Sequence, residues 1–219
     1  NIEGYKEKGF LPEAFINMLV FLGWNPGNAQ EIFSMDELIK EFSLERVGKS
    51  GSRYSYQKTK WFNQQHLRLK SNQEIREKTT FPKDFKKSEE YILKVIELVK
   101  ERCTFFEDVI KESNYLFSAP DDYNSVAVEK KWNKETVSHL ISLKSKFISS
   151  KDFTKNNIEL IFKDYLELSQ VGFGQVMPGL RISITGKMQG PSMFSVMELL
   201  GLHEVISRID KAIEILGNG

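Results

Sequence analysis

The chain has 219 residues, of which 40% are hydrophobic and 28% charged, the balance of an ordinary globular protein with one large or two small domains. Its net charge of +1 points to no charged partner, and the single cysteine excludes a disulfide framework and a multi-cysteine zinc site. No apolar run approaches the roughly 20 residues that span a bilayer, and no signal peptide opens the chain. The start at Asn1, without a methionine, suggests a fragment of a longer protein.

The first strong helix signal begins at Pro12, whose fixed φ suits a first helical turn. Apolar residues then recur at three- and four-residue spacing and predict one buried face, formed by Phe15, Met18, Leu19 and Leu22. Gly23 is expected to end this helix in the left-handed conformation, and 25–27 (NPG) to form a turn.

Three capping boxes predict further helix starts, because in each a Ser or Thr and a Glu three residues later satisfy each other's backbone N–H groups. They lie at Ser34–Glu37, Ser71–Glu74 and Thr104–Glu107. Periodicity predicts other helices at 56–69, where Trp61 and Phe62 should both point inward, and at 89–100, 126–132, 135–148, 175–185, 193–200 and around 205–213. A helix from Thr154 should stop at Gly172. No period-two alternation appears, so the fold class is predicted to be all-α.

Two domains are predicted, at 1–69 and 70–219, with a weaker subdivision near 133. The main boundary falls after the first basic helix, near 69–72. Neither position carries a flexible linker, so the parts are expected to pack end to end.

The residues that could carry catalysis or bind a metal are isolated from one another. His66, His139 and His203 are scattered, and none has a second ligand at helical spacing, so no metal site is expected. Cys103 follows a cation, which lowers a thiol pKa, but no histidine lies near it in the sequence. The segment 48–51 (GKSG) imitates a P-loop without its strand and leading glycine. No catalytic residue is therefore predicted.

Basic residues are concentrated between Arg46 and Lys87, where twelve lysines and arginines face only three acidic residues. Tyr54, Tyr56, Trp61 and His66 are interleaved with them. Lysines and arginines neutralise phosphates, so a solvated basic face and contact with an RNA backbone are the two interpretations of this run. The candidate backbone contacts are Arg46, Lys49, Arg53, Lys58 and Lys60.

Several separated motifs together resemble one family. They are LPEAFINML, FLGW, NPG and EIFS between 11 and 34, FSLERV at 42–47, KSG at 49–51, KWFN at 60–63 and PGLRISITG at 178–186. In this order they resemble the region that follows the KMSKS-type loop in bacterial glutamyl-tRNA synthetases. The resemblance covers essentially the whole chain.

The resemblance implies a helical stem-contact domain at 1–69, which grips the inner corner of tRNA, and an α-helical anticodon-binding cage at 70–219. The family's HIGH and KMSKS motifs, which bind ATP and activate glutamate, do not occur here. It therefore implies a fragment that is inactive alone, without a cofactor of its own, from a cytoplasmic parent that uses ATP and Mg to ligate glutamate to tRNA(Glu). The expected partner is tRNA(Glu). No association with a membrane is expected, and the chain is expected to be monomeric.

The resemblance also implies which residues meet the anticodon. Arg102, in the run 98–117, is implied to meet the third anticodon base, and Arg181, in 178–186, to face the anticodon as well. The loop 190–194, with Gly190 and Met193, should lie beside the same bases. A guanidinium suits this role because it stacks on a base and donates hydrogen bonds to base edges.

Two positions depart from the family pattern. Arg102 is followed by Cys103 and Thr104 instead of apolar and acidic residues, and Gly190 replaces a side chain that contacts a base in some members. These departures leave open whether the parent also accepts glutamine tRNA.

Two rival interpretations remain. A helical protein-interaction module would show no tRNA affinity and no salt dependence of binding. A free-standing enzyme is disfavoured, because no nucleophile, base and metal set converges in the sequence.

Overall fold

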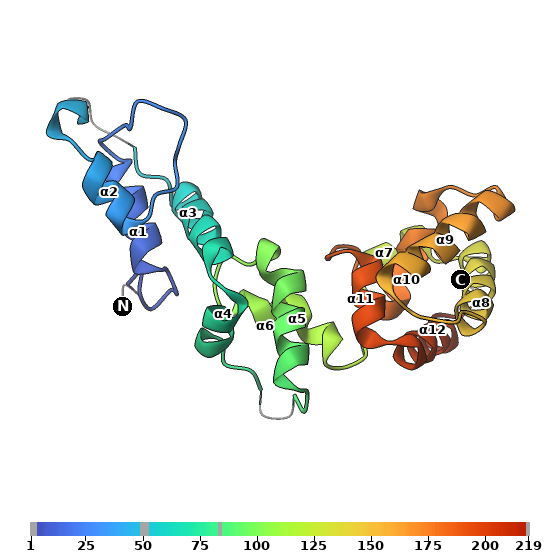
Figure 1. Cartoon of the computed structure of the whole chain (residues 1–219). Helices are drawn as coiled ribbons and strands as arrows, with labels where there is room; N and C mark the ends of the chain where they lie inside the picture. Colours follow the sequence, from blue (N-terminus) through green and yellow to red (C-terminus); the bar gives the residue numbers. More distant parts are fainter. Residues whose placement is uncertain (1–3, 49–52, 83–84, 218–219) are drawn as a thin grey trace. The chain divides into compact units, whose positions relative to one another are not determined.

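The computed structural model describes residues 4–48, 53–82 and 85–217. Within these ranges the chain forms helices joined by turns, and its only strand-like feature is a single bridge between Trp24 and Val47 (Figure 1). The all-α prediction is confirmed. The chain forms two compact units: unit 1 is Asn1–Asp84 with Val99–Glu112, and unit 2 is Phe85–Leu98 with Ser113–Gly219. These packing units differ from the predicted domains, which were defined by what each binds and stay a prediction.

Unit 1 is built on the packing of its first helix against its longest one, α3. Its elements are α1 (Pro12–Val20), α2 (Met35–Glu41), η1 (Leu44–Arg46), α3 (Tyr56–Leu69), α4 (Asn72–Lys78), η2 (Lys100–Arg102) and all but the last residue of α6 (Asp108–Ser113). The capping boxes at Ser34 and Ser71 form as predicted. The third does not: Asp108 Oδ2 accepts from the N–H groups of Thr104 and Phe105 at 3.0 and 2.9 Å, and α6 begins at that aspartate.

The end of α1 differs from the prediction. Phe21 is its C-cap in a right-handed conformation, and Gly23 does not adopt a positive φ. The left-handed glycine of this segment is Gly27, at φ 79°, where the N–H of Gly27 donates to Asn25 Oδ1 at 2.7 Å in the predicted turn. Turn chemistry beyond the helix, rather than a glycine C-cap, therefore redirects the chain.

Two side chains predicted to be buried are exposed, Leu19 and Trp61. Their neighbours in the sequence, Met18 and Phe62, are buried. Adjacent residues on an α-helix point about 100° apart, given 3.6 residues per turn, so a buried face that takes a residue and one of its neighbours leaves the other neighbour exposed. The buried side of α1 includes the polar Asn17 instead.

Unit 2 contains the larger apolar core. Its helices are α5 (Glu89–Val99, except its last residue), η3 (Asn114–Leu116), α7 (Ser125–Lys131), α8 (Lys134–Ile148), α9 (Lys155–Ser169), α10 (Phe173–Thr185), α11 (Met193–Leu200) and α12 (Leu202–Leu216). Helix α10 packs against α7, α8, α12 and η3 and is buried along most of its length (Figure 1). It is therefore the central helix of the unit.

The start of α10 corrects another expectation. Helix α9 ends at Ser169 because Gln170 adopts the left-handed conformation, with φ 55°. Gly172, expected to stop α9, is instead the N-cap of α10, and its N–H donates to Gln175 Oε1 at 2.7 Å. Helix α10 thus begins at Phe173, two residues earlier than predicted.

Candidate nucleic-acid interface

Arg181 projects from the central helix of unit 2. Gly179 lets α10 approach α8 closely, since a Cβ there would lie 2.3 Å from Thr136 Cγ2. Pro178, inside the same helix, has no N–H, so the carbonyl of Gly174 receives no α-helical bond from it. Close packing therefore holds the backbone that carries Arg181.

The loop after α10 holds the guanidinium in place. The Nη2 of Arg181 donates to the carbonyl of Pro191 at 2.9 Å. Gly186, at φ 70°, sits where a Cβ would lie 2.5 Å from the carbonyl oxygen of Asp122, so only glycine fits this corner. A Cβ at Gly190 would lie 2.8 Å from Arg181 Nη1, so this glycine leaves room for the guanidinium.

Beside Arg181 lies a hollow of about 380 Å³ with mostly apolar walls, which we call the Arg181 hollow. Phe173 and Met188 stand at its side with 56% and 37% of their surface exposed. Phe173 also makes an edge contact with Phe162, at 5.6 Å between ring centroids. Apolar and aromatic walls next to a guanidinium can stack a planar base and donate hydrogen bonds to its edge.

Gly190 and Met193 have different positions at this hollow. Gly190 lies beside the Arg181 guanidinium, whereas Met193 lines the hollow from the core and is only 2% exposed. Their predicted contact with a base stays a prediction. Sequence reasoning missed Phe173, because it assigned this residue to a loop before a helix at 175; an aromatic side chain directly after Gly172 was the available signal.

Sequence reasoning also missed Arg208, which holds the end of α10. Arg208 is 2% exposed, and its Nη1 donates to the carbonyls of Tyr115 and Ile184 at 2.6 and 2.9 Å. Its Nε pairs with Glu204 at 2.7 Å. This arginine therefore ties η3, the end of α10 and α12 together.

Arg102 belongs to unit 1, at the end of η2. Its Nε donates to Glu112 Oε2 at 3.3 Å, and both side chains are about one-third exposed. The carboxylate orients the guanidinium without burying it. Arg102 and Arg181 thus lie on separate units, and each is positioned by its own partner.

The predicted backbone contacts in unit 1 are in different situations. Arg46 Nη1 donates to the carbonyl of Pro26 at 2.7 Å, and Lys58 pairs with Glu31 at 2.6 Å. Arg53 is exposed, and Lys60 Nζ lies 5.1 Å from the centre of the Tyr56 ring. Lys49 lies outside the described residues.

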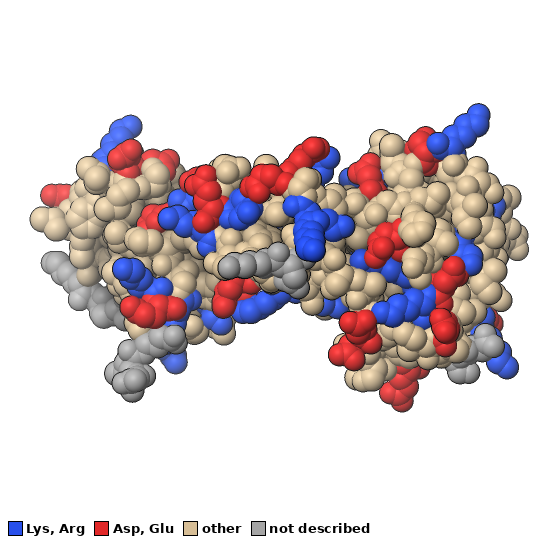
Figure 2. All heavy atoms as spheres, turned by 90° about the horizontal axis from the view of Figure 1, so that it is seen from below, with Lys and Arg blue, Asp and Glu red and all other residues tan. Residues whose placement is uncertain are grey.

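Acidic residues from elsewhere in the sequence offset part of the basic run. Besides Glu31 on Lys58, Glu13 pairs with Lys70 at 2.6 Å and Glu101 with Arg68 at 3.1 Å. On the face drawn in Figure 2, basic and acidic side chains are interspersed. The excess of positive charge counted along the sequence is therefore smaller where the side chains meet.

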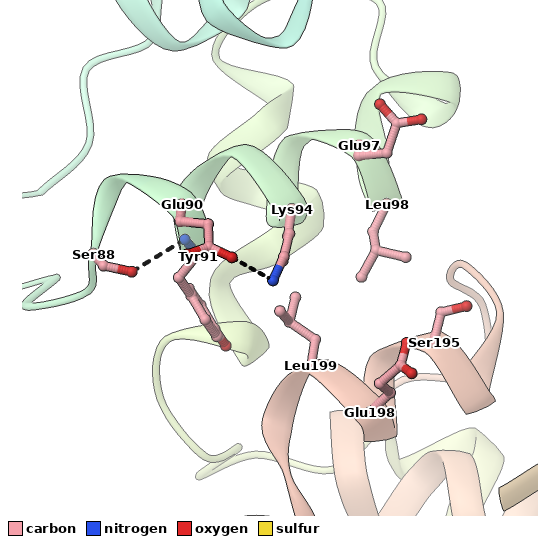
Figure 3. A pocket seen from close by; sticks show the side chains of 9 residues that line it. All are labelled: Ser88, Glu90, Tyr91, Lys94, Glu97, Leu98, Ser195, Glu198 and Leu199. Carbon is pink, nitrogen blue, oxygen red and sulfur yellow. Dashed lines mark hydrogen bonds and ion pairs between the residues drawn. The ribbon is translucent and has the colours of Figure 1, made fainter. Parts of the chain in front are cut away.

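A second hollow of unit 2, of about 680 Å³, lies between α5 and α11 (Figure 3). Three carboxylates line it, from Glu90, Glu97 and Glu198, and its one lysine, Lys94, pairs with Glu90 at 2.7 Å. Its acidic lining repels phosphates, which makes it a poor site for a nucleic acid.

The described residues were also searched for a reactive cysteine and for a set of metal ligands. Cys103 is fully buried, its Sγ donates to the carbonyl of Val99 at 3.3 Å, and burial raises its pKa to about 12, so the thiol stays protonated at neutral pH. Among the described residues no group of three or more His, Cys, Asp or Glu side chains is placed to hold a metal ion. In the same ranges, no helix is both long and apolar enough to cross a membrane.

Comparison with known proteins identifies the family to which the chain is similar. Residues 60–213 match the family model of the anticodon binding domain, and 1–61 match the model described as tRNA synthetases class I (E and Q), catalytic domain. The two models meet inside α3, close to but not at the predicted boundary of 69.

Curated glutamate–tRNA ligases match nearly the whole chain. The ligase of Flavobacterium psychrophilum is 42% identical over 216 residues, which are 97% of this chain and 43% of the ligase. That of Porphyromonas gingivalis is 38% identical over 220 residues, 98% of this chain and 43% of the ligase. The chain thus spans less than half the length of these relatives.

Solved structures agree. A glutamate tRNA ligase from Elizabethkingia meningosepticum, in complex with its amino acid, matches with a TM-score of 0.81 and 43% identity over 97% of this chain and 43% of that one. A glutamate-tRNA synthetase from Elizabethkingia anophelis gives 0.80 and 43% identity over 96% of this chain and 42% of the other. Because the anticodon-binding model alone covers more than half of the sequence, this chain belongs to the anticodon-binding domain family, in the form that occurs in glutamate–tRNA ligases.

Proposed function

We propose that this chain is the tRNA-binding part of a glutamate–tRNA ligase and that it reads the anticodon of tRNA(Glu) with Arg181. The observation that carries the proposal is the position of the guanidinium, held by the carbonyl of Pro191 at the side of an apolar hollow. Single-stranded bases are recognised by stacking and by hydrogen bonds to their edges, and this hollow offers both.

Each wall of the Arg181 hollow has a role in this proposal. The exposed ring of Phe173 offers a stacking surface, and base–aromatic stacking is worth about 1–3 kcal/mol per base. The Arg181 guanidinium carries five donors in a fixed fork, of which one already holds Pro191. In this proposal the guanidinium selects a base by the acceptors on the base edge.

Arg102 is proposed as a second reader, for the third anticodon base. Its pair with Glu112 presents the guanidinium with a defined orientation, which lowers the entropy lost when a base binds. Predicted contacts of Gly190 and Met193 with the anticodon, and of Arg46, Lys49, Arg53, Lys58 and Lys60 with the tRNA backbone, belong to the same proposal.

The parent protein would join glutamate to tRNA(Glu) with ATP and Mg²⁺, both bound by the part outside this chain. The chain alone should select the tRNA as a monomer in the cytoplasm and should not aminoacylate it. No residue of this chain is assigned to ATP or to the metal.

The proposal is tested by fluorescence anisotropy with a labelled tRNA(Glu) transcript and a transcript altered only at the third anticodon base. Wild type, Arg102→Ala and Arg181→Ala are compared at two salt concentrations. We expect wild type to prefer the unaltered transcript, and each variant to lose affinity of about 10-fold or more, since a good side chain–base pair is worth about 1–3 kcal/mol. Arg102→Ala should in addition erase the preference for the third base.

Equal binding of both transcripts by wild type would contradict the assignment of Arg102 to that base. An Arg181→Ala variant that binds tRNA as tightly as wild type does would contradict the proposal that Arg181 reads the anticodon. A lost phosphate contact would weaken both transcripts equally and lower the salt dependence, so the measurement separates base recognition from phosphate attraction.

A further inference from the structure

Unit 1 contains a hollow of about 350 Å³ that the proposed tRNA binding does not use. It is lined by residues from the start of α1, the start of α2, the end of α3 and the start of α4. Three of its side chains are carboxylates, from Glu13, Glu37 and Glu74, so we call it the carboxylate hollow. Its volume lies within the range of about 300–1,000 Å³ that small-ligand sites occupy, and its carboxylates repel phosphates.

The charges of the carboxylate hollow do not balance. Its one basic side chain, Lys70, pairs with Glu13 at 2.6 Å and lies 3.8 Å from Glu74. Glu37 makes no ion pair with any part of the chain that the structure describes. Three carboxylates thus face one ammonium, which leaves an excess of two negative charges in the lining.

Capping boxes hold two of these carboxylates in place. Glu37 Oε2 accepts from the N–H of Ser34 at 2.7 Å, and Glu74 Oε2 accepts from the N–H of Ser71 at 2.8 Å. These backbone N–H groups keep the pKa of Glu37 and the pKa of Glu74 below their ordinary values, so both carboxylates are ionised at neutral pH. An ionised carboxylate offers about four lone-pair sites, so each can accept a further hydrogen bond from a ligand.

His66 supplies an independent observation, because it lines the hollow and is only 4% exposed. Asn17 Oδ1 accepts from the N–H of Phe33 at 2.9 Å and lies 3.0 Å from His66 Nε2, so this nitrogen carries the proton. Burial holds the pKa of His66 below its ordinary value, so the ring is neutral at pH 7 and Nδ1 keeps its lone pair. Nδ1 makes no hydrogen bond to the described residues. Buried acceptors nearly always have a donor, so Nδ1 needs one from a molecule in the hollow.

The rim of the carboxylate hollow is apolar. Met35 and Leu69 both line it and are 45% and 72% exposed. Exposed side chains of this kind can pack against an aliphatic chain and remove its surface from water. The lining thus combines carboxylates, one acceptor nitrogen and an apolar rim.

We propose that the carboxylate hollow binds a small aliphatic diamine as its dication. The two ammonium groups bind Glu37 and Glu74, one of them also donates to His66 Nδ1, and the methylene chain packs against the apolar rim. An ammonium carries three donors and no acceptor, which matches a lining of acceptors, and two of them balance the excess charge. Among the described residues no three His, Cys, Asp or Glu side chains are placed to hold a metal ion, which favours an organic cation.

The experiment is isothermal titration calorimetry of the whole chain with 1,4-diaminobutane at pH 7.5 and 150 mM salt, which screens exposed charges. Butylamine and 1,4-butanediol are titrated in the same way to test the need for two charges. The variants are Glu37→Gln and Glu74→Gln, and each keeps its capping box, because Gln serves in place of Glu there. Glu41→Gln is the matched control, since Glu41 is exposed at the end of α2 and does not line the hollow.

We expect wild type to bind the diamine about 10-fold more tightly than butylamine and not to bind the diol. Glu37→Gln and Glu74→Gln should each weaken binding of the diamine about 10-fold, because each removes one charge-assisted hydrogen bond. Glu41→Gln should stay within about 2-fold of wild type, because an exposed carboxylate outside the hollow attracts the ligand only weakly.

Nitrogen-15 NMR of the histidine side chains provides a second readout. On addition of the diamine the Nδ1 resonance of His66 should shift, because its lone pair accepts a hydrogen bond, whereas those of His139 and His203, outside the hollow, should stay. His66→Gln keeps a donor for Asn17 Oδ1 but lacks Nδ1. It should therefore weaken binding of the diamine about 3–10-fold at unchanged stability, which a purely structural role of His66 would not produce.

The proposal is overturned if wild type does not bind the diamine or binds butylamine as tightly. Lining variants that match Glu41→Gln would overturn it as well, and so would an Nδ1 resonance of His66 that stays unchanged while the diamine binds. The site needs no RNA, so these outcomes are independent of the anticodon test.

Discussion

The two units hold their candidate binding side chains by different means. In unit 2, Arg181 stands on a helix surrounded by a continuous apolar core, whose fully buried members include Leu140, Phe147, Phe162 and Leu180. In unit 1 the corresponding apolar cluster includes Trp24, Phe33 and Leu38, and buried polar side chains link the segments around it. Apolar burial stabilises a fold without requiring a particular geometry, whereas a buried hydrogen bond is lost when either partner changes. The stability of the two units should therefore respond differently to substitution and to pH.

Asn63 shows how a polar bridge organises unit 1. Its Oδ1 accepts from the N–H of Leu11 at 2.7 Å, and its Nδ2 donates to the carbonyl of Thr104 at 2.6 Å. One fully buried side chain on α3 thereby joins the start of α1 to the segment before α6.

Asn17 and His66 form a second bridge. Asn17 Oδ1 accepts from the N–H of Phe33 at 2.9 Å and lies 3.0 Å from His66 Nε2, while its Nδ2 donates to the carbonyl of Glu31 at 3.1 Å. Because this oxygen accepts, His66 must carry a proton on Nε2. Neutral histidine meets that requirement.

The largest effect is expected at a buried charged side chain of unit 2, Arg208. Arg208→Met should destabilise the protein by about 3–5 kcal/mol, because two buried carbonyls lose their donor and Glu204 loses its partner. Urea unfolding measures it, with the exposed Lys146→Met as control, expected within about 0.5 kcal/mol of wild type. Equal stability of the two variants would mean that the apolar core alone holds α10.

Asn63→Ala should lower the stability of unit 1 by about 2–4 kcal/mol. It leaves the Leu11 N–H and the Thr104 carbonyl unbonded, at about 1–3 kcal/mol for each buried group. The same unfolding measurement applies, with Gln57→Ala on the exposed start of α3 as control. A loss no greater than that of the control would remove the distinction between the two units.

Gly190→Ala should weaken tRNA binding about 10-fold, or about 1.4 kcal/mol, and leave stability nearly unchanged. The new Cβ would lie 2.8 Å from Arg181 Nη1, and the flexible guanidinium should give way and leave its position at the hollow. In a double-mutant cycle, Gly190→Ala combined with Arg181→Ala should be no worse than Arg181→Ala alone. Additive losses would show that Gly190 acts on the RNA directly.

The smallest effect is a pH dependence confined to unit 1. Burial holds the pKa of His66 below its ordinary value, with Glu13 opposing the shift and Lys70 adding to it. The unfolded chain therefore binds the proton more tightly than the folded one, so the stability of unit 1 is complete above about pH 6.5 and falls as the pH drops below it. Hydrogen exchange of unit 1 amides between pH 7.5 and 5.5 measures this loss.

His66→Gln is the control for that prediction, because an amide can still donate to Asn17 Oδ1 but does not titrate in this range. The variant should show a flat profile. A wild-type profile as flat as that of the variant would rule out the histidine as the source.

The sequence predicts local signals well. The bounds of α3 and α11 and the capping boxes at Ser34 and Ser71 agree with the structure, because each depends on residues within one or two turns. The expectation at Thr104 is wrong because Asp108, four residues on, accepts from the Thr104 N–H that Glu107 was expected to take. Two local signals competed there, and no rule of spacing decides between them.

Only part of the candidate site could be predicted from the sequence, because the rest depends on which residues become neighbours in the fold. Arg102 and Arg181 were found through a resemblance that covers the whole chain, and the family is confirmed. Phe173 could not be found in this way, because its role depends on its being exposed beside Arg181. Exposure and hydrogen bonding depend on which segments meet.

The sequence by itself determined the helical class, most helix ends and the family, because periodicity, capping and motif order are all local properties of the chain. Only the tertiary structure decided which basic side chains are neutralised, as Lys58 is by Glu31, and which line one hollow without an ion pair among the described residues, as Lys8, Lys60 and Lys78 do. The physical reason is range: hydrogen bonds, ion pairs and burial act over a few ångströms of space, and residues far apart in the sequence enter that range only when the chain has folded.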